Sequence, residues 1–393
     1  GLPDLASHHN TPSPWSSTAK RYNPEGSKGT PVTSSAACAD LAEMERSHLE
    51  QFLASLGEDR FRARQIFGWV YRRGVTDFSL MSDLSKALRA SLNNQLIVST
   101  PCIVARLRSS DDTEKFLLEL GDGCRIESVF IPESHAMTFC VSTQVGCAMG
   151  CAFCLTGKMG LVRNLTAGEM AGQVRVLAQA LSLAGTRFNI VLMGMGEPLH
   201  NYDETMKALR ILADSSGLAI SPRRITLSTI GIVPELDRLA AEPLMPNLAI
   251  SLHATTEEQR GLLVPLNRKY HIEDVLAACR RFPVKRRDRI TFEYVLLDGV
   301  NDSPEDARRL VRLLHGIRAK VNLIPLNEAP GIRFGRPSDD RVSAFAEILA
   351  DHRVTVSVRK SRGRDIRAGC GQLIVEGQKR SPGQRLASAM GQV

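Results

Sequence analysis

The amino-acid sequence predicts an α/β fold: an open partial barrel of six strand–helix units, preceded by a helical module and short antiparallel strands. From Thr138 onward, apolar runs of strand length alternate with segments of helical periodicity. This alternation indicates a parallel sheet covered by helices, and six units are too few for a closed eight-stranded barrel. The candidate strands are Thr138–Ser142, Asn189–Met193, Arg224–Leu227, Leu248–Leu252, Arg289–Leu296 and Val321–Pro325, and the candidate helices include Ala167–Ser182, Glu204–Ala213, Ile272–Arg281, Pro304–Leu314 and Ser338–Ala350.

The segments before and after this core have their own patterns. Residues 1–40 are rich in Ser, Thr, Pro and Gly, which predicts a disordered extension. Residues 41–97 show apolar residues at helical spacing, among them Phe61, Ile66, Phe67 and Val70, and predict a helical accessory module that binds RNA. Residues 98–132 predict antiparallel strands, 133–364 the core, and 365–393 a C-terminal loop and tail. The antiparallel strands are expected at Ile103–Leu107, Lys115–Leu120 and Arg125–Ile131.

The composition argues against a membrane-spanning protein and against a disulfide-rich secreted one. The chain has 393 residues, a formal net charge of +8, and no apolar run approaching the ~18 residues that span a bilayer. An odd number of cysteines, nine, and no signal-peptide pattern favour a reducing cytoplasm over a disulfide framework. The excess of basic over acidic residues favours a nucleic-acid partner. Positive residues cluster at Arg72-Arg73, at Arg223-Arg224, within residues 285–289 and within residues 359–364.

Three cysteines are the most informative motif. Cys147, Cys151 and Cys154 form a C-x3-C-x2-C run with no fourth cysteine at ferredoxin spacing. Three thiolates can hold three irons of a 4Fe–4S cluster and leave the fourth iron open to a small molecule, as catalytic metal sites keep a vacant position. Structural zinc is the alternative, although zinc sites usually bring a second cysteine pair or histidines.

Further candidate positions follow the predicted strands, where the mouth of such a barrel lies. Gly196 and Glu197 come after the second strand, and glycine there allows a ligand to approach the backbone. Cys370 lies between two glycines and near arginines, as a reactive thiol would. Cys140, inside the first strand, is interpreted either as a core residue or as a second thiol at the mouth. Small polar groups at the same rim are expected from Ser228, Ser251-Leu252-His253 and Asn327.

Taken together, four motifs resemble the radical S-adenosylmethionine (SAM) 23S rRNA adenine methyltransferases, and most closely the C2-methylating branch that also modifies tRNA. The motifs are the three cysteines, Gly194-Met195-Gly196-Glu197-Pro198, Ser251-Leu252-His253 and Gly369-Cys370-Gly371-Gln372-Leu373. The resemblance runs from about Phe61 to Leu373 and implies a partial barrel of the radical SAM type.

The resemblance implies a role for each site residue. Cys147, Cys151 and Cys154 would ligate the cluster, and its open iron would hold SAM. Cys370 would carry the methyl group and Cys140 would release the product through a disulfide. Glu127 would accept the ring proton, although read alone it is an ordinary solvent-facing strand residue. The implied SAM contacts are Gly196, Glu197, Ser228, Ser251, Leu252, His253 and Asn327.

The implied reaction consumes two SAM molecules per turnover by a ping-pong route. Its expected partners are 23S rRNA at the peptidyl-transferase centre, a tRNA anticodon loop, and an electron donor such as flavodoxin, with the enzyme acting as a monomer. One alternative is a methylase acting at C8 of the same adenosine, a change linked to antibiotic resistance. Another is a non-catalytic RNA-binding protein whose cysteines hold zinc.

Overall fold

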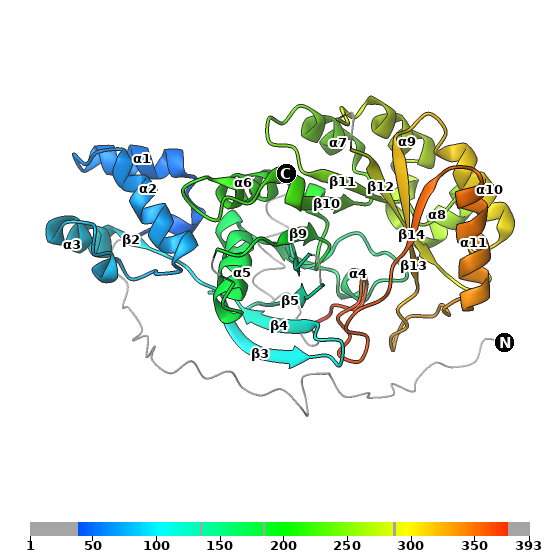
Figure 1. Ribbon diagram of the computed structural model, residues 1–393, viewed down its shortest axis with the longest axis horizontal. Helices are drawn as coiled ribbons and strands as arrows, with labels where there is room; N and C mark the ends of the chain where they lie inside the picture. The colour runs from blue at the N-terminus through cyan, green and yellow to red at the C-terminus, as the bar shows by residue number, and fades with distance from the viewer. Residues whose placement is uncertain (1–37, 134–135, 184, 286–287, 376–393) are drawn as a thin grey trace, which may run out of the picture.

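The core of the computed structural model is one ten-stranded sheet, and the structure describes residues 38–133, 136–183, 185–285 and 288–375. Seven of its strands run parallel in chain order, and helices cover their outer side (Figure 1). These strands are β6 (Thr138–Cys140), β9 (Asn189–Leu192), β10 (Ile225–Thr229), β11 (Asn247–Ser251), β12 (Ile290–Leu296), β13 (Ala319–Pro325) and β14 (Thr355–Val358). The six predicted strands are all present, and β14 was not predicted.

Three antiparallel strands continue the same sheet beyond β6. They are β3 (Cys102–Arg108), β4 (Glu114–Glu119) and β5 (Arg125–Ile131), and β5 pairs with β6 from Val129–Cys140 to Ile131–Thr138. The turns between them contain the residues that favour turns, such as Asp122, whose carboxylate accepts a hydrogen bond from Cys124 N at 2.9 Å. The predicted linking strands are therefore an extension of the core sheet.

The helices of the core begin at clear capping signals. Thr166 caps α5 (Ala167–Ala180) and Ser303 caps α10 (Pro304–Leu313), and each forms a capping box with an acidic residue three positions on. Apolar residues on the inner faces, such as Leu310, are buried against the sheet. The remaining core helices are α4 (Leu155–Met159), α6 (Tyr202–Ala213), α7 (Val233–Ala240), α8 (Glu257–Leu263), α9 (Ile272–Arg281) and α11 (Asp339–Asp351).

A separate helical lobe precedes the sheet and rests on α5 and α6 (Figure 1). Phe67 and Tyr71 are buried in it, with ring centroids 5.1 Å apart. Ion pairs fasten the lobe to the core, among them Arg46–Asp214 at 2.8 Å and Arg210–Glu45 at 2.9 Å. Its elements are β1 (Ala39–Asp40), α1 (Arg46–Ser55), α2 (Phe61–Phe67), a π-helical turn (Gly68–Arg72), α3 (Lys86–Gln95) and β2 (Leu96–Ile97), with short 3-10 turns at Leu41–Glu43 and Phe78–Leu80.

Two sequence expectations concern the ends of the chain. The extension predicted over residues 1–40 lies outside the described residues except for its last part, and there Ala39–Asp40 form β1 and pair in parallel with β2. The tail after residue 375 lies outside them as well. Within the described ranges, no helix combines the length and the apolar character needed to cross a bilayer.

Candidate active site

The three motif cysteines surround one end of a cavity at the carboxyl ends of the parallel strands. They lie between β7 (Gln144–Gly146), which pairs with β8 (Leu161–Asn164), and α4. Backbone hydrogen bonds fix the loop, from Cys147 N to Gly160 O at 3.0 Å and from Ala152 N to Leu263 O at 2.9 Å. All three thiols line the cavity, so the fold brings together the residues that the spacing indicated.

The three thiols have the properties of ligands that need a metal to ionise them. Burial raises the pKa of Cys147 to about 12 and raises the pKa values of Cys151 and Cys154 as well. A buried thiol gives up its proton readily only when metal ions replace it. Within the described chain, no three histidine, cysteine or carboxylate side chains are arranged to hold one metal ion. Thiols set around a cavity, instead of around a single point, suit a multi-iron cluster.

The opposite wall of the cavity is the segment after β9. Glu197 is buried, and its carboxylate accepts hydrogen bonds from Leu199 N at 3.1 Å and Ile230 N at 3.0 Å. Burial raises its pKa to about 7. Gly196 has a φ of +110°, a conformation that favours glycine. A Cβ atom on Gly196 would lie 2.7 Å from Thr143 Oγ1, so only glycine leaves this wall undisturbed.

The substitution Gly196→Ala is expected to weaken binding of the SAM that the sequence resemblance implies by at least about tenfold, because the added methyl group strains the backbone and displaces the wall. Equilibrium dialysis of cluster-loaded protein with labelled SAM measures the effect. Gly121→Ala is the matched control, because nothing lies within 4 Å of a Cβ at that turn. Equal SAM affinity in the two variants would contradict the prediction.

The rim of the cavity carries the predicted small polar groups. Ser228 Oγ and Ser251 Oγ are 3.3 Å apart at the ends of β10 and β11. His253 accepts a hydrogen bond at Nδ1 from Val295 N at 3.1 Å, and burial lowers its pKa to about 3, so the ring stays neutral with its proton on Nε2. Asn327 Oδ1 is buried without a hydrogen-bond partner among the described residues and is available to a ligand. Leu252 is fully buried and does not line the cavity.

Cys370 lies where this cavity meets a second one. It lines the first cavity with the three motif cysteines, and the second with Cys140 and Arg359. The charge of Cys370 raises the pKa of Arg359, and burial raises the pKa of Cys140 to about 12, with Cys370 adding to the effect. Both thiols therefore lie within electrostatic range of each other and of one guanidinium group.

The loop that carries Cys370 is fastened to the core. Gly371 O accepts a hydrogen bond from Leu155 N at 2.7 Å, next to the cysteine motif. Thr156 Oγ1 donates to Leu373 O at 2.6 Å, and Asn327 Nδ2 donates to Cys370 O at 3.3 Å. These bonds hold the Cys370 segment against the wall formed by α4.

Glu127 does not face solvent, contrary to what its strand position alone suggested. It is fully buried on β5 and forms an ion pair at 2.9 Å with Lys115 on β4, which is buried too. Its other oxygen accepts a hydrogen bond from Ile374 N at 2.8 Å, and Lys115 Nζ donates to Arg367 O at 3.3 Å. The pair thus holds both ends of the Cys370 loop, and Glu127 lines neither cavity.

Sequence reasoning missed three residues of this region. Arg359 was assigned to a basic cluster, although the structure turns it toward Cys140 and Cys370. Lys115 was read as a strand residue only. Glu293, on β12, lines the first cavity and accepts a hydrogen bond from Asn322 Nδ2 at 2.7 Å. The available signal for Lys115 and Glu293 was a charged residue inside an otherwise apolar strand.

Comparisons with known proteins agree with this geometry. The model of the Ribosomal RNA large subunit methyltransferase N-terminal domain matches residues 39–98, and that of the Radical SAM superfamily matches residues 141–311. The Dual-specificity RNA methyltransferase RlmN of Syntrophobacter fumaroxidans is 51% identical over 84% of this chain and 96% of its own length. The RlmN of Geobacter sulfurreducens is 50% identical over 85% of this chain and 91% of its own. Among solved structures, a radical SAM methyltransferase from Sphaerobacter thermophilus superposes with a TM-score of 0.81 at 49% identity, covering 85% of this chain and 99% of that one. This likeness confirms the predicted partial α/β barrel.

Proposed function

The chain belongs to the RlmN family of dual-specificity radical SAM RNA methyltransferases. On that premise we propose that it methylates C2 of an adenosine in 23S rRNA and C2 of another adenosine in a tRNA anticodon loop. We also propose the peptidyl-transferase centre as the location of the rRNA target. One observation carries the proposal: Cys370 lines both the cavity of the three motif cysteines and the cavity that contains Cys140.

The enzyme uses a 4Fe–4S cluster and SAM, which supply a transferable methyl group and, upon reduction, a 5′-deoxyadenosyl radical. We assign the iron ligands to Cys147, Cys151 and Cys154, which line the cavity together. Glu197 lies across from them and suits the ammonium group of SAM. The further proposed SAM contacts are Gly196, Ser228, Ser251, Leu252, His253 and Asn327, of which Leu252 contributes only as packing beneath the rim.

The chemistry of the target explains why a second thiol is needed. C2 of adenine is electron-poor and carries no lone pair, so it does not displace a methyl group from SAM directly. The Cys370 thiolate is an adequate nucleophile and accepts the methyl group first. That methyl group gives up one hydrogen atom to the 5′-deoxyadenosyl radical, and its carbon then bonds to C2 of the ring, which releases its own hydrogen as a proton while one electron would return to the cluster. The thiolate of Cys140 then attacks the sulfur of Cys370, and the electron pair of the broken carbon–sulfur bond stays on the carbon, which takes up a proton to become the methyl group. That attack forms a Cys140–Cys370 disulfide and releases the methylated base. It requires Cα atoms about 4.4–6.8 Å apart.

Glu127 is the proposed acceptor of the proton that leaves C2. Its carboxylate is held by Lys115 and by Ile374 N, behind the Cys370 loop. In this role the hydrogen bond from Ile374 N must open, because it occupies one of the two carboxylate oxygens. Lys115 forms an ion pair with that carboxylate in its buried position.

The surroundings of the second cavity suit an RNA substrate. Arg359, Lys360 and Arg362 line it together with Cys140. Positive side chains there can neutralise phosphates while the target base enters the cavity, as base-modifying enzymes require. We further propose a monomeric enzyme that works in the cytoplasm, where these RNAs are, and that takes electrons from a donor such as flavodoxin.

The first test is the mass of the Cys370 peptide after anaerobic cluster reconstitution and incubation with SAM. We expect an added methyl group in the wild type and none in Cys151→Ala, because SAM is no longer held beside Cys370. Chromatography of RNA nucleosides should then show 2-methyladenosine. An unmodified peptide in active wild-type enzyme would contradict the proposed carrier, and 8-methyladenosine would contradict the proposed position.

A further inference from the structure

A large cavity lies at the opposite end of the strands from the active site. It measures about 560 Å³, far above the ~30 Å³ that one water occupies in the liquid. Its walls come from the lobe after Tyr71, from the end of α5, and from the segments that lead into β9 and β10. The active site uses the carboxyl ends of the same two strands, and at about 3.3 Å per residue the four-residue β9 separates the two sites by roughly 13 Å.

Five arginines line this cavity, and none of the described residues that line it is acidic. They come from four separate parts of the fold and are Arg72, Arg73, Arg175, Arg187 and Arg224. Arginines elsewhere on the molecule, such as Arg163 and Arg238, are paired with carboxylates at 2.7 Å. None of the five forms an ion pair with a carboxylate of the described chain. The cavity therefore gathers five positive charges that no carboxylate of the described residues pairs with.

The contacts of these arginines are to neutral groups. Arg72 Nε donates to Gly217 O at 2.8 Å, and Arg224 Nη1 donates to Asn189 Oδ1 at 3.2 Å. The guanidinium group of Arg73 stacks 4.0 Å from the ring centre of Trp69. Arg187 is exposed at the edge of the cavity. These contacts orient the side chains and leave their charge available to a ligand.

Arg175 is the strongest sign of a missing negative partner. Its side chain is 2% exposed, and Nη2 donates to Ser99 O at 2.9 Å and Thr100 Oγ1 at 2.8 Å. Its Nη1 is buried without a hydrogen-bond partner among the described residues. The charge of Asp40 acts on Arg175, but Asp40 forms no ion pair with it. A buried cation of this kind is costly unless an anion completes its surroundings.

We propose that this cavity binds phosphate groups, at a site separate from the reaction centre. Arginine guanidinium groups donate paired hydrogen bonds that match phosphate oxygens, and several around one cavity can hold more than one phosphate. Two sources carry that chemistry: the backbone of the RNA substrate, and a free oligophosphate or nucleotide. No step of the proposed methylation uses this cavity, so the phosphate site can be tested separately from the reaction.

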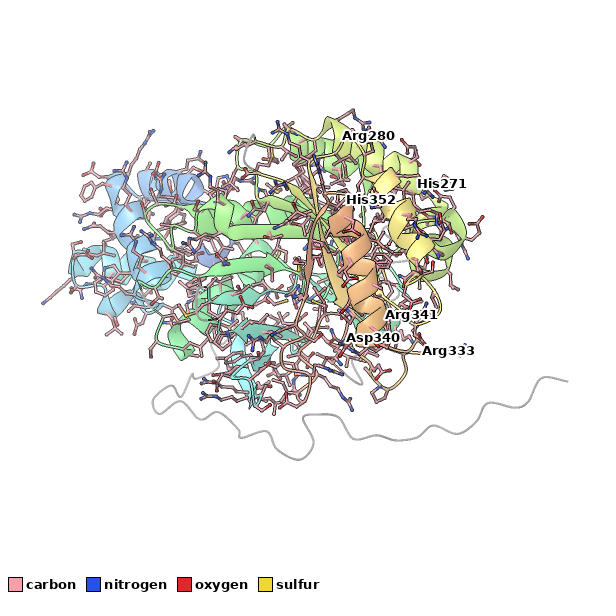
Figure 2. All side chains as sticks on the ribbon, turned by 45° about the vertical axis from the view of Figure 1, so that its right-hand side comes forward. His271, Arg280, Arg333, Asp340, Arg341 and His352 are labelled. Atoms are coloured by element: carbon pink, nitrogen blue, oxygen red, sulfur yellow. The ribbon has the colours of Figure 1, made fainter. Side chains whose placement is uncertain are left out.

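The test compares the wild type with the variant Arg73→Gln/Arg187→Gln, in which neutral side chains replace two of the five arginines. Both are used as full-length, cluster-loaded protein. Both side chains are exposed and neither makes an ion pair with a described residue, so the fold should survive. Inorganic tripolyphosphate is titrated by calorimetry, and a 23S rRNA fragment containing the target adenosine is titrated by fluorescence anisotropy at several salt concentrations. Arg280→Gln/Arg308→Gln is the control: it removes the same charge from the outer helices α9 and α10, and Arg280 lies there in Figure 2.

We expect the cavity variant to lose at least about tenfold in affinity for one probe, while the control stays within about twofold of the wild type. If the RNA is the source, its salt dependence should also fall by about 1 to 2 in log–log slope, one step per lost phosphate contact. A loss confined to tripolyphosphate identifies a free phosphate ligand. Arg175→Met should give the same pattern with the same probe. Equal affinities of the cavity and control variants for both probes would overturn the proposal.

Discussion

The Cys140→Ala variant is expected to accumulate RNA covalently bound to Cys370, whereas Cys370→Ala is expected to form neither product nor adduct. Cys140 supplies the thiolate that releases the product by forming a disulfide, so without it the carbon–sulfur bond to the base persists. Cys370 carries the methyl group itself, so its loss removes the route entirely. Product formation should fall at least about a thousandfold in both variants, as for residues that act as a unit.

Denaturing gels of the reaction with labelled RNA separate the two variants, and peptide mass analysis locates the bond. The control is Cys102→Ala, which removes an exposed thiol on β3 that lines neither active-site cavity. It should behave as the wild type. An adduct in Cys370→Ala, or turnover in Cys140→Ala, would show that another residue carries or releases the methyl group.

The sequence was informative where one short segment determines the chemistry. The spacing of Cys147, Cys151 and Cys154 fixes three thiols on one loop, and the alternation of apolar runs fixes a parallel sheet with its carboxyl ends at one mouth. Strand β14 was missed because it is a mostly exposed edge strand of four residues with little apolar signal. The hairpin of β7 and β8 was missed for a similar reason, since β7 has only three residues.

The features that the sequence did not indicate depend on contacts between residues far apart in the chain. Glu127 seemed solvent-facing because an alternating strand normally leaves one side in water. Strands β4 and β5 are instead buried on both sides, and the Cys370 loop, more than two hundred residues later, covers the side that contains Glu127. The five-arginine cavity likewise combines the lobe, α5 and the loop before β10, and no local pattern links these segments.

Replacing Lys115 by methionine is expected to lower the free energy of unfolding by about 3–5 kcal/mol, the usual cost of leaving a buried charge without its partner. The carboxylate of Glu127 would remain buried with Ile374 N, and Arg367 O would lose its donor. Of the two contacts that this buried pair makes with the Cys370 loop, only the one at Ile374 would remain, so methylation of Cys370 should fall as well. Urea unfolding followed by circular dichroism measures the first effect.

Two comparisons separate the buried charge from ordinary loss of packing. The double substitution Lys115→Met/Glu127→Leu removes both charges, so it should recover most of the lost stability while product formation stays low. Arg125→Met breaks an ion pair with Glu119 on the same two strands, but its partners are 48% and 37% exposed, so it should cost less than about 1 kcal/mol. A charge left buried without its partner should cost far more stability than a broken exposed ion pair. If Lys115→Met were no more destabilising than Arg125→Met, the prediction that the Lys115–Glu127 pair stabilises the Cys370 loop would be wrong.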